Sequence, residues 1–289
     1  MMSSLLSVVK RHPLITFFVL TYALSWVAYP MWASGLYPIA PVFSFAPFLV
    51  ALLVLAITQG KSGVGGLLRR MVRWRVGLKW YVAALLIPAG ITVAAAVLNL
   101  GLGAQVPSSA ELGSWTGLLV TFLAVLLIPG LGGAWEEPGW RGFALPRLQT
   151  GRSALFASLI LGVLIAGWHL PLMVVGQVHY ADLLTIMGAV IIFNWVFNNA
   201  NGSVLIIMLM HATNNTISGQ LFGTMFSGAD SVRQSWLVAA LWCAVAIVVV
   251  VVAGPAHLSR KHKKQEESEE GAAEPGVATP PGAVKPTPA

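Results

Sequence analysis

Charged residues are scarce in this chain, and acidic residues are the scarcest. Only 9% of the 289 residues are charged, against about 25% in an ordinary soluble domain. Five acidic residues precede position 266, while 57% of the chain is hydrophobic and the mean hydropathy is +0.78. This composition excludes a soluble globular domain and predicts an all-α, polytopic membrane protein.

Cysteine is also nearly absent. The one cysteine, Cys243, lies in the apolar run 236–253, so an internal disulfide is excluded. Cys243 has no basic neighbour to activate its thiol, and we expect it to be a packing residue. The sequence shows neither a Gly-x-Ser-x-Gly elbow nor an evident Ser-His-Asp triad. The common patterns of serine and cysteine hydrolases are therefore excluded.

Long apolar runs are plentiful. A spanning helix needs about 20 mainly apolar residues, and the chain has eight candidate segments. They are 14–34, 40–58, 80–100, 114–131, 153–174, 183–200, 203–222 and 236–254. The first contains an apolar stretch that is longer than the core of a signal peptide, roughly 7–15 residues, so we expect a retained helix.

The net charge of +7 arises from 17 basic and 10 acidic residues. In a membrane protein such an excess indicates positive-inside topology and attraction to anionic lipid, so we expect membrane lipid and no nucleic acid as a partner. The loop 59–79 holds six basic residues and no acid, which predicts that it is cytoplasmic. Both termini then fall in the cytoplasm of a multi-pass cell-membrane protein. Within this region, 67–80 has the pattern of an amphipathic interfacial helix.

The composition changes near the C-terminus. Residues 1–256 hold the eight apolar segments and predict one transmembrane domain. Residues 257–289 are first basic, then acidic, and finally rich in Pro and Ala. Such a segment cannot form a packed core, so we expect a disordered cytoplasmic tail.

Two of the few acids are adjacent. Glu136 and Glu137 follow the fourth apolar segment, and Arg141 comes shortly after them. On a helix Glu137 and Arg141 are four residues apart and can pair, whereas Glu136 points to a different side. A structural salt bridge at the membrane boundary is the simpler interpretation. A carboxylate near hydrocarbon is nevertheless costly, which makes Glu136 a candidate catalytic base and Glu137 with Arg141 its supporting pair.

Histidines and an amide add to this set. His169 lies deep in the fifth apolar segment, where a lone histidine is more often a packing residue. His211 and Asn215 are four residues apart and share one helix face. They could simply bond neighbouring helices, or they could donate to one oxyanion. The joint occurrence of Glu136, His169, His211 and Asn215 favours activation of water and stabilisation of a tetrahedral intermediate.

The order of these residues resembles the motifs of the CAAX prenyl endopeptidase and bacteriocin-processing family (also called Abi or CPBP), which are intramembrane glutamic-type peptidases. The family's Glu-Glu-x-x-x-Arg motif is matched by Glu136, Glu137 and Arg141. Its His-x-x-x-Asn motif is matched by His211 and Asn215.

The remaining family motif, Phe-x-x-x-His, is matched at His169 but has Ile165 in place of phenylalanine. The substitution alters packing behind His169 and casts little doubt on the chemistry. The resemblance implies a membrane-embedded endopeptidase. In it, Glu136 and His169 activate water, and His211 and Asn215 form the oxyanion hole. The substrate would be a peptide or protein, either prenylated or otherwise membrane-anchored.

Three alternatives stay open. A glutamate and two histidines could ligate zinc, although His-Glu-x-x-His spacing is absent, so we expect no cofactor and keep zinc as the alternative. The site could be a structural network in a non-catalytic immunity or membrane partner protein. A proton-relaying transporter is less favoured, because the other spans lack acids.

Overall fold

The chain is built from helices joined by short connections. The computed structural model describes residues 2–36, 40, 42–108 and 115–259, and these contain no β-strand. The sequence-based prediction of an all-α, polytopic membrane protein is thereby confirmed. The predicted tail from residue 260 onward lies outside the described residues.

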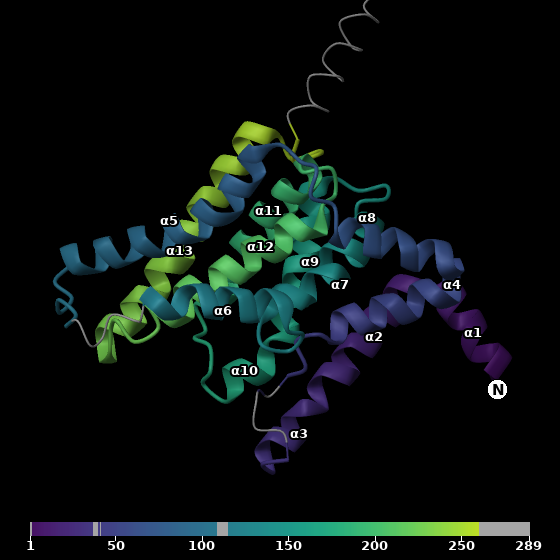
Figure 1. Cartoon of the computed structure of the whole chain (residues 1–289), viewed down its shortest axis with the longest axis horizontal. Coiled ribbons are helices and arrows are strands. Elements are labelled where there is room, and N and C mark those ends of the chain that lie inside the picture. The colour runs from purple at the N-terminus through teal and green to yellow at the C-terminus, as the bar shows by residue number, and fades with distance from the viewer. Residues whose placement is uncertain (1, 37–39, 41, 109–114, 260–289) are drawn as a thin grey trace, which may run out of the picture.

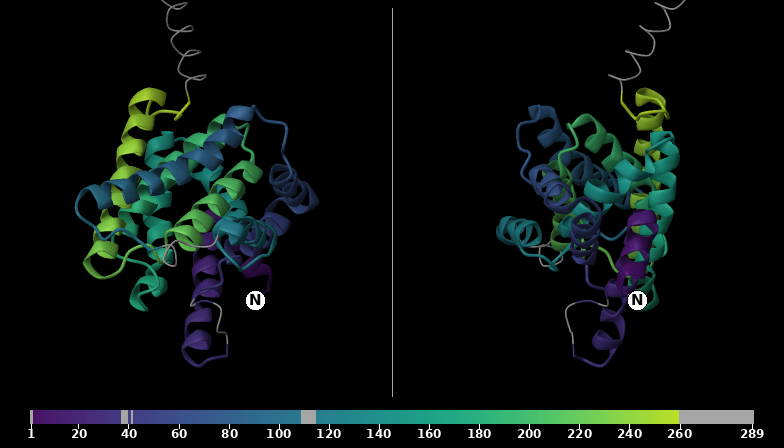
Figure 2. Two further views of the ribbon diagram at one scale, coloured as in Figure 1. Left: turned by 60° about the vertical axis from the view of Figure 1, so that its left-hand side comes forward. Right: turned by 90° about the vertical axis from the view of Figure 1, so that its right-hand side faces the viewer.

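The N-terminal half supplies the outer helices. They are α1 (Met2–Arg11), α2 (Pro13–Trp26), α3 (Ala28–Ala33), α4 (Ala46–Met71), α5 (Leu78–Gly101) and α6 (Trp115–Leu127). The pair α2 and α3 projects from the rest of the molecule (Figures 1 and 2). Helix α4 changes direction at Gly60, whose φ of 61° is readily adopted by glycine.

The C-terminal half holds a central group of helices. A run of short elements comes first: η1 (Gly133–Glu136), α7 (Glu137–Gly139), η2 (Trp140–Ala144) and α8 (Leu145–Leu148). It is followed by α9 (Ala154–Trp168), α10 (Leu170–Val174), α11 (Asp182–Asn199), α12 (Val204–Asn215), η3 (Thr216–Leu221) and α13 (Gly228–Ala253). Helices α11 and α12 lie in the middle, between α5 and α13 on one side and α9 on the other (Figure 1).

All eight predicted apolar segments contain helix, but they differ in length. Five stretches are long and apolar enough to cross a membrane: 13–33, α4, α5, α11 and α13. The other three predicted segments correspond to the shorter helices α6, α9 and α12. Helix α12 continues directly into the π-helix η3, and a single residue, His169, separates α9 from the short helix α10. These two apolar segments are therefore longer than the regular helices within them.

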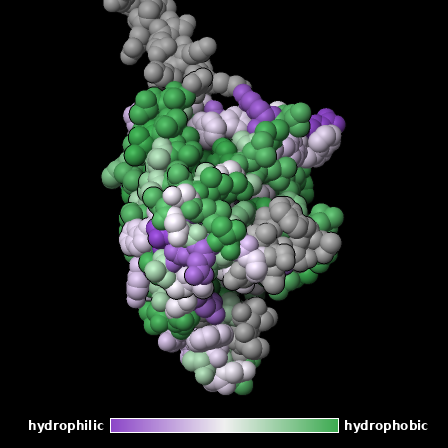
Figure 3. Space-filling view, turned by 90° about the vertical axis from the view of Figure 1, so that its left-hand side faces the viewer, coloured by the Kyte–Doolittle hydropathy of each residue, from purple (hydrophilic) through white to green (hydrophobic). Residues whose placement is uncertain are grey.

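The surface of the bundle fits a hydrocarbon environment. Hydrophobic residues cover most of the face formed by α5 and α13, and hydrophilic ones gather in small areas (Figure 3). Val251 is 75% exposed and Leu86 64% exposed. Water-soluble proteins seldom expose apolar area of this extent, whereas contact with lipid carries no such cost.

The prediction of one interfacial helix over 67–80 is wrong in its bounds, because only 67–71 and 78–80 are helical. Helix α4 ends at Met71, residues 72–77 are not helical, and α5 begins at Leu78. Hydrogen bonds from the turn between α11 and α12 keep residues 72–77 in a non-helical conformation. Ser203 Oγ donates to the Arg73 carbonyl at 2.7 Å, and the Arg73 guanidinium donates to the Asn201 carbonyl. These long-range bonds outweigh the local amphipathic pattern.

The packed part of the chain extends past α13. The Ala154 amide donates to the Ala256 carbonyl at 2.6 Å, and Asn199 donates to the Leu258 carbonyl at 2.8 Å. The side chains of Leu258 and Ser259 are buried. The segment after α13 therefore closes over the ends of α9 and α11 as far as Ser259 at least.

Candidate active site

An irregular helical segment carries the paired glutamates. Residues 133–144 form one turn of 3-10 helix, one of α-helix and one of π-helix in succession. Pro138 lies at the start of this α-turn, a position that does not need its missing N–H. At Gly139 a Cβ would come 2.5 Å from the Pro47 carbonyl oxygen, so only glycine allows α7 to approach α4 so closely. The segment is thus held in the interior.

Glu137 binds two basic side chains of the site, Arg141 and His211. Both of its carboxylate oxygens accept hydrogen bonds from Arg141 Nη1, at 3.0 and 2.9 Å. Its Oε1 also lies 2.6 Å from His211 Nδ1. Glu137 is fully buried and Arg141 only 3% exposed. The predicted Glu137–Arg141 pair is formed, and the bond to His211 adds a connection across 74 residues that sequence reasoning missed.

Arg141 is fixed on its other side by Asn194 on α11. Arg141 Nε donates to Asn194 Oδ1 at 3.0 Å, and Asn194 Nδ2 donates to Ser158 Oγ on α9 at 2.9 Å. The guanidinium also lies over the ring of Phe193, 5.0 Å from its centroid. Sequence reasoning did not single out Asn194 or Ser158. The signal was available, since both are polar residues inside apolar segments.

Glu136 points away from the ion pair. Its Oε2 accepts a hydrogen bond of 3.1 Å from the indole of Trp140, and the residue is 4% exposed. Each of the two carboxylates bonds the residue four positions later. Glu136 bonds Trp140, and Glu137 bonds Arg141. The two adjacent carboxylates therefore have separate partners, as the helix geometry predicts, and one oxygen of Glu136 remains for the cavity.

His169 caps the C-terminus of α9. Its Nδ1 lies 2.8 Å from the Ile165 carbonyl, and its ring packs against the edge of Trp168. A carbonyl can only accept, so Nδ1 carries the hydrogen. In the neutral imidazole, Nε2 then has a free lone pair. This orientation is what a proton acceptor requires.

Asn215 and His211 lie beside the glycine-rich start of η1. The Gly133 amide donates to Asn215 Oδ1 at 3.1 Å, which leaves the amide group of Asn215 as a donor. A Cβ at Gly133 would lie 2.0 Å from His211 Nε2. The absence of a side chain at this position is therefore needed for α12 to bring His211 beside the glutamates.

One cavity of about 230 Å³ joins these groups. Its polar lining includes all six residues singled out in the sequence: Glu136, Glu137, Arg141, His169, His211 and Asn215. Apolar side chains of α11 complete its wall, among them Ile186, Val190 and Phe193. The structure thus places carboxylate, imidazole and amide groups from three segments around a single space.

The residues around this space do not form an evident metal centre. Among the described residues, no group of three or more His, Cys, Asp and Glu side chains is arranged to hold a metal ion. Glu137 and one nitrogen of each histidine are already occupied by hydrogen bonds. We therefore assign no reaction step to a metal.

The fold and the site together define the class as an all-helical membrane protein with a buried carboxylate–histidine cavity. Comparison with known proteins shows which proteins this chain is similar to. Residues 115–217, which include all six candidate residues, match the sequence model of the type II CAAX prenyl endopeptidase Rce1-like family. The chain is also similar to the protein named CAAX prenyl protease 2 from Methanococcus maripaludis, with 23% identity over 228 residues, which is 72% of this chain and 84% of that protein. Over residues 115–217, and more weakly over most of its length, the chain is thus similar to CAAX prenyl endopeptidases.

Proposed function

We propose that this protein hydrolyses a peptide bond within the 230 Å³ cavity, and that Glu136 and His169 activate the attacking water. The observation that supports this proposal is that a single cavity is lined by Glu136, His169, His211 and Asn215. Trp140 occupies one oxygen of Glu136 and leaves the other. The Ile165 carbonyl fixes the His169 tautomer whose Nε2 accepts a proton. Both groups can then hold the same water molecule.

His211 and Asn215 are the proposed donors to the oxyanion. Glu137 accepts a bond from His211 Nδ1, and Gly133 directs the Asn215 amide. When His211 is protonated, its Nε2 also becomes a donor. Glu136 and Glu137 are then balanced by Arg141 and the His211 imidazolium, and Asp182 is a further carboxyl group that lines the cavity. Losing one such donor costs about 2.7–4 kcal/mol of transition-state stabilisation.

The reaction follows from these positions. The water oxygen attacks the carbonyl carbon, and its proton passes to Glu136 or His169. The carbonyl oxygen becomes the oxyanion that His211 and Asn215 stabilise. When the C–N bond breaks, the same proton is returned to the leaving amine, which yields an amine and a carboxylic acid, and the acid then releases its proton to water.

The proposed substrate is a peptide or protein held at the membrane by a lipid group. The relative is named CAAX prenyl protease 2, and apolar residues of α11 form part of the cavity wall here. A prenyl chain attached near the scissile bond could lie along such a wall. This makes a prenylated C-terminal peptide the first substrate to test.

The test uses the purified protein in liposomes with a fluorescent farnesylated CAAX peptide and the same peptide without the lipid. We expect cleavage of the farnesylated peptide, and loss of cleavage in Glu136→Ala, His169→Ala and His211→Ala. A strong chelator should leave the rate unchanged. Activity that is lost with chelator and restored only by zinc would defeat the metal-free mechanism, and full activity in the three variants would defeat the assigned site.

A further inference from the structure

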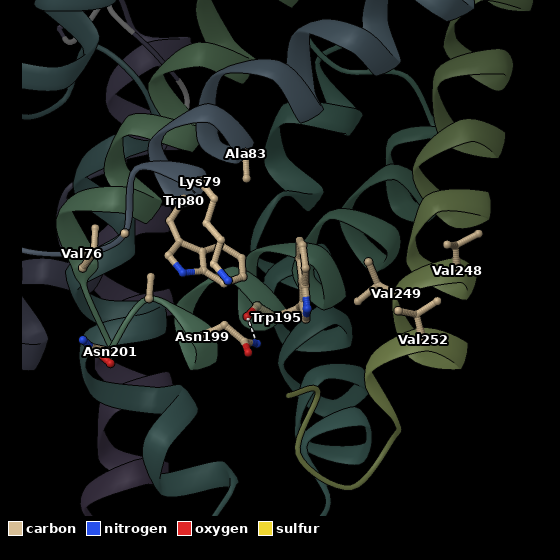
Figure 4. Close-up of a pocket in the computed structure, with 12 residues that line it drawn as sticks. Val76, Lys79, Trp80, Ala83, Trp195, Asn199, Asn201, Val248, Val249 and Val252 are labelled. Atoms are coloured by element: carbon tan, nitrogen blue, oxygen red, sulfur yellow. Dashed lines mark hydrogen bonds between the residues drawn. The ribbon is translucent and has the colours of Figure 1, made fainter. Parts of the chain in front are cut away.

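A second, larger cavity lies apart from the candidate active site. It has a volume of about 600 Å³ and lies between the start of α5, the end of α11 and the end of α13 (Figure 4). None of its lining residues also lines the active-site cavity. The mechanism proposed above makes no use of it.

One wall of this cavity is purely hydrocarbon. Val248, Val249 and Val252 of α13 form it, and Ala83 of α5 adds to the apolar lining (Figure 4). Val248 is 59% exposed and Val252 44% exposed, although both belong to a helix that is long and apolar enough to span the membrane. Such a wall is suited to an acyl chain rather than to water.

The opposite wall is aromatic and basic. Trp80 and Trp195 meet edge to face, with ring centroids 5.2 Å apart, and the Lys79 ammonium lies 5.1 Å from the Trp80 ring centroid. Arg73 is bonded to the carbonyl of Asn201, which is itself a lining residue. None of the described residues that line the cavity is acidic. Tryptophan next to lysine is typical of the level at which lipid headgroups lie.

The side chain of Asn199, another polar lining residue, is bonded within the fold. Asn199 Nδ2 donates to the Trp195 carbonyl and to the Leu258 carbonyl, and Asn199 Oδ1 accepts from Ser259. Asn199 thus stabilises the lining of the cavity by joining α11 to the segment after α13. The Lys79 ammonium, on an exposed side chain, is the cation that can meet a ligand. A cation at one end and hydrocarbon at the other select an amphiphile with an anionic head.

We propose that this cavity binds one anionic phospholipid. Its headgroup would contact Lys79, with Arg73 nearby, and the upper part of an acyl chain would lie between the two tryptophans and the α13 valines. The lipid would come from the leaflet on the side of residues 72–79, which the charge pattern predicts to be cytoplasmic. This inference does not depend on the proposed catalytic mechanism.

The test is native mass spectrometry of the purified full chain in detergent, titrated with phosphatidylglycerol or with phosphatidylcholine of the same acyl chains. We expect phosphatidylglycerol to be retained more strongly. Lys79→Glu should weaken its binding by about fivefold or more, because one basic residue near a membrane contributes about that factor. Lys61→Glu, which changes a lysine outside the cavity, is the matched control and should have a much smaller effect.

A second variant tests the hydrocarbon wall. Val252→Trp should fill the cavity and reduce retention of both lipids. Val93→Trp is its control, because Val93 is 45% exposed on α5 and does not line the cavity. Each variant is first shown to be folded by its melting temperature. Equal retention of the two lipids, an unchanged affinity in Lys79→Glu, or equal losses in Val252→Trp and Val93→Trp would overturn the proposal.

Discussion

The Nδ1 atom of His211 lies 2.6 Å from Oε1 of Glu137, and the same carboxylate binds the Arg141 guanidinium. One buried anion is therefore shared by two basic groups on different helical elements. This relationship ties α12 to the irregular segment that carries Glu136. It also separates the two adjacent glutamates, because Glu136 is bonded to Trp140 instead.

Substituting each glutamate in turn tests this separation. Glu136→Gln should lower kcat by about 10²–10⁴-fold, with the melting temperature unchanged, because it removes a proton acceptor. Glu137→Gln should reduce kcat less. It should cost about 3–5 kcal/mol of stability, since Arg141 and His211 lose their buried counter-charge. Rates and melting curves are measured on the same preparations. A larger kcat loss in folded Glu137→Gln would mean that the two roles are reversed.

Asn194 is expected to act as a positioning residue for Arg141. Asn194→Leu leaves the buried Arg141 Nε–H without its acceptor, at a cost of about 1–3 kcal/mol in stability. We expect a lower kcat with little change in KM, because Asn194 does not line the cavity and acts through the position of Arg141. Ser158→Ala is the matched control, since it removes the next bond but leaves the one to Arg141. Equal kcat values for the two variants would contradict this assignment.

His169 is expected to be needed for chemistry and not for folding. His169→Ala should lower kcat by about 10²–10⁴-fold, because it removes one of the two proposed acceptors of the water proton. Membrane expression and melting temperature should stay near those of the parent protein. His12→Ala, at an exposed position before α2, is the control and should leave kcat unchanged. Comparable activity in both variants would remove His169 from the mechanism.

Gly133 is expected to be intolerant of any side chain. In Gly133→Ala the new Cβ would lie 2.0 Å from His211 Nε2, so the imidazole or η1 must move. We predict loss of peptide cleavage and a lower melting temperature. Gly65→Ala is the control, because its Cβ would meet nothing within 4 Å and alanine favours the helix. Normal cleavage by Gly133→Ala would show that the position of His211 is not critical.

Much of this organisation was predictable from local sequence. Apolar runs of spanning length predict helices in lipid, because every backbone polar group must be satisfied within the membrane. The Glu137–Arg141 pair follows from the helical repeat, which places residues four apart side by side. The adjacent glutamates, the two histidines and Asn215 indicated a common site, and all of them line one cavity.

The tertiary structure decided which of these groups meet. Neither the bond between Glu137 and His211 nor the contact of Arg141 with Asn194 has a local signal, because the partners are 74 and 53 residues apart. Only the packing of α11 and α12 around the irregular segment brings them together. The same holds for residues 72–77, where bonds to Asn201 and Ser203 override an amphipathic pattern. Local periodicity determines which segments form helices, whereas long-range hydrogen bonds and close glycine contacts determine where the helices stop and which buried charges pair.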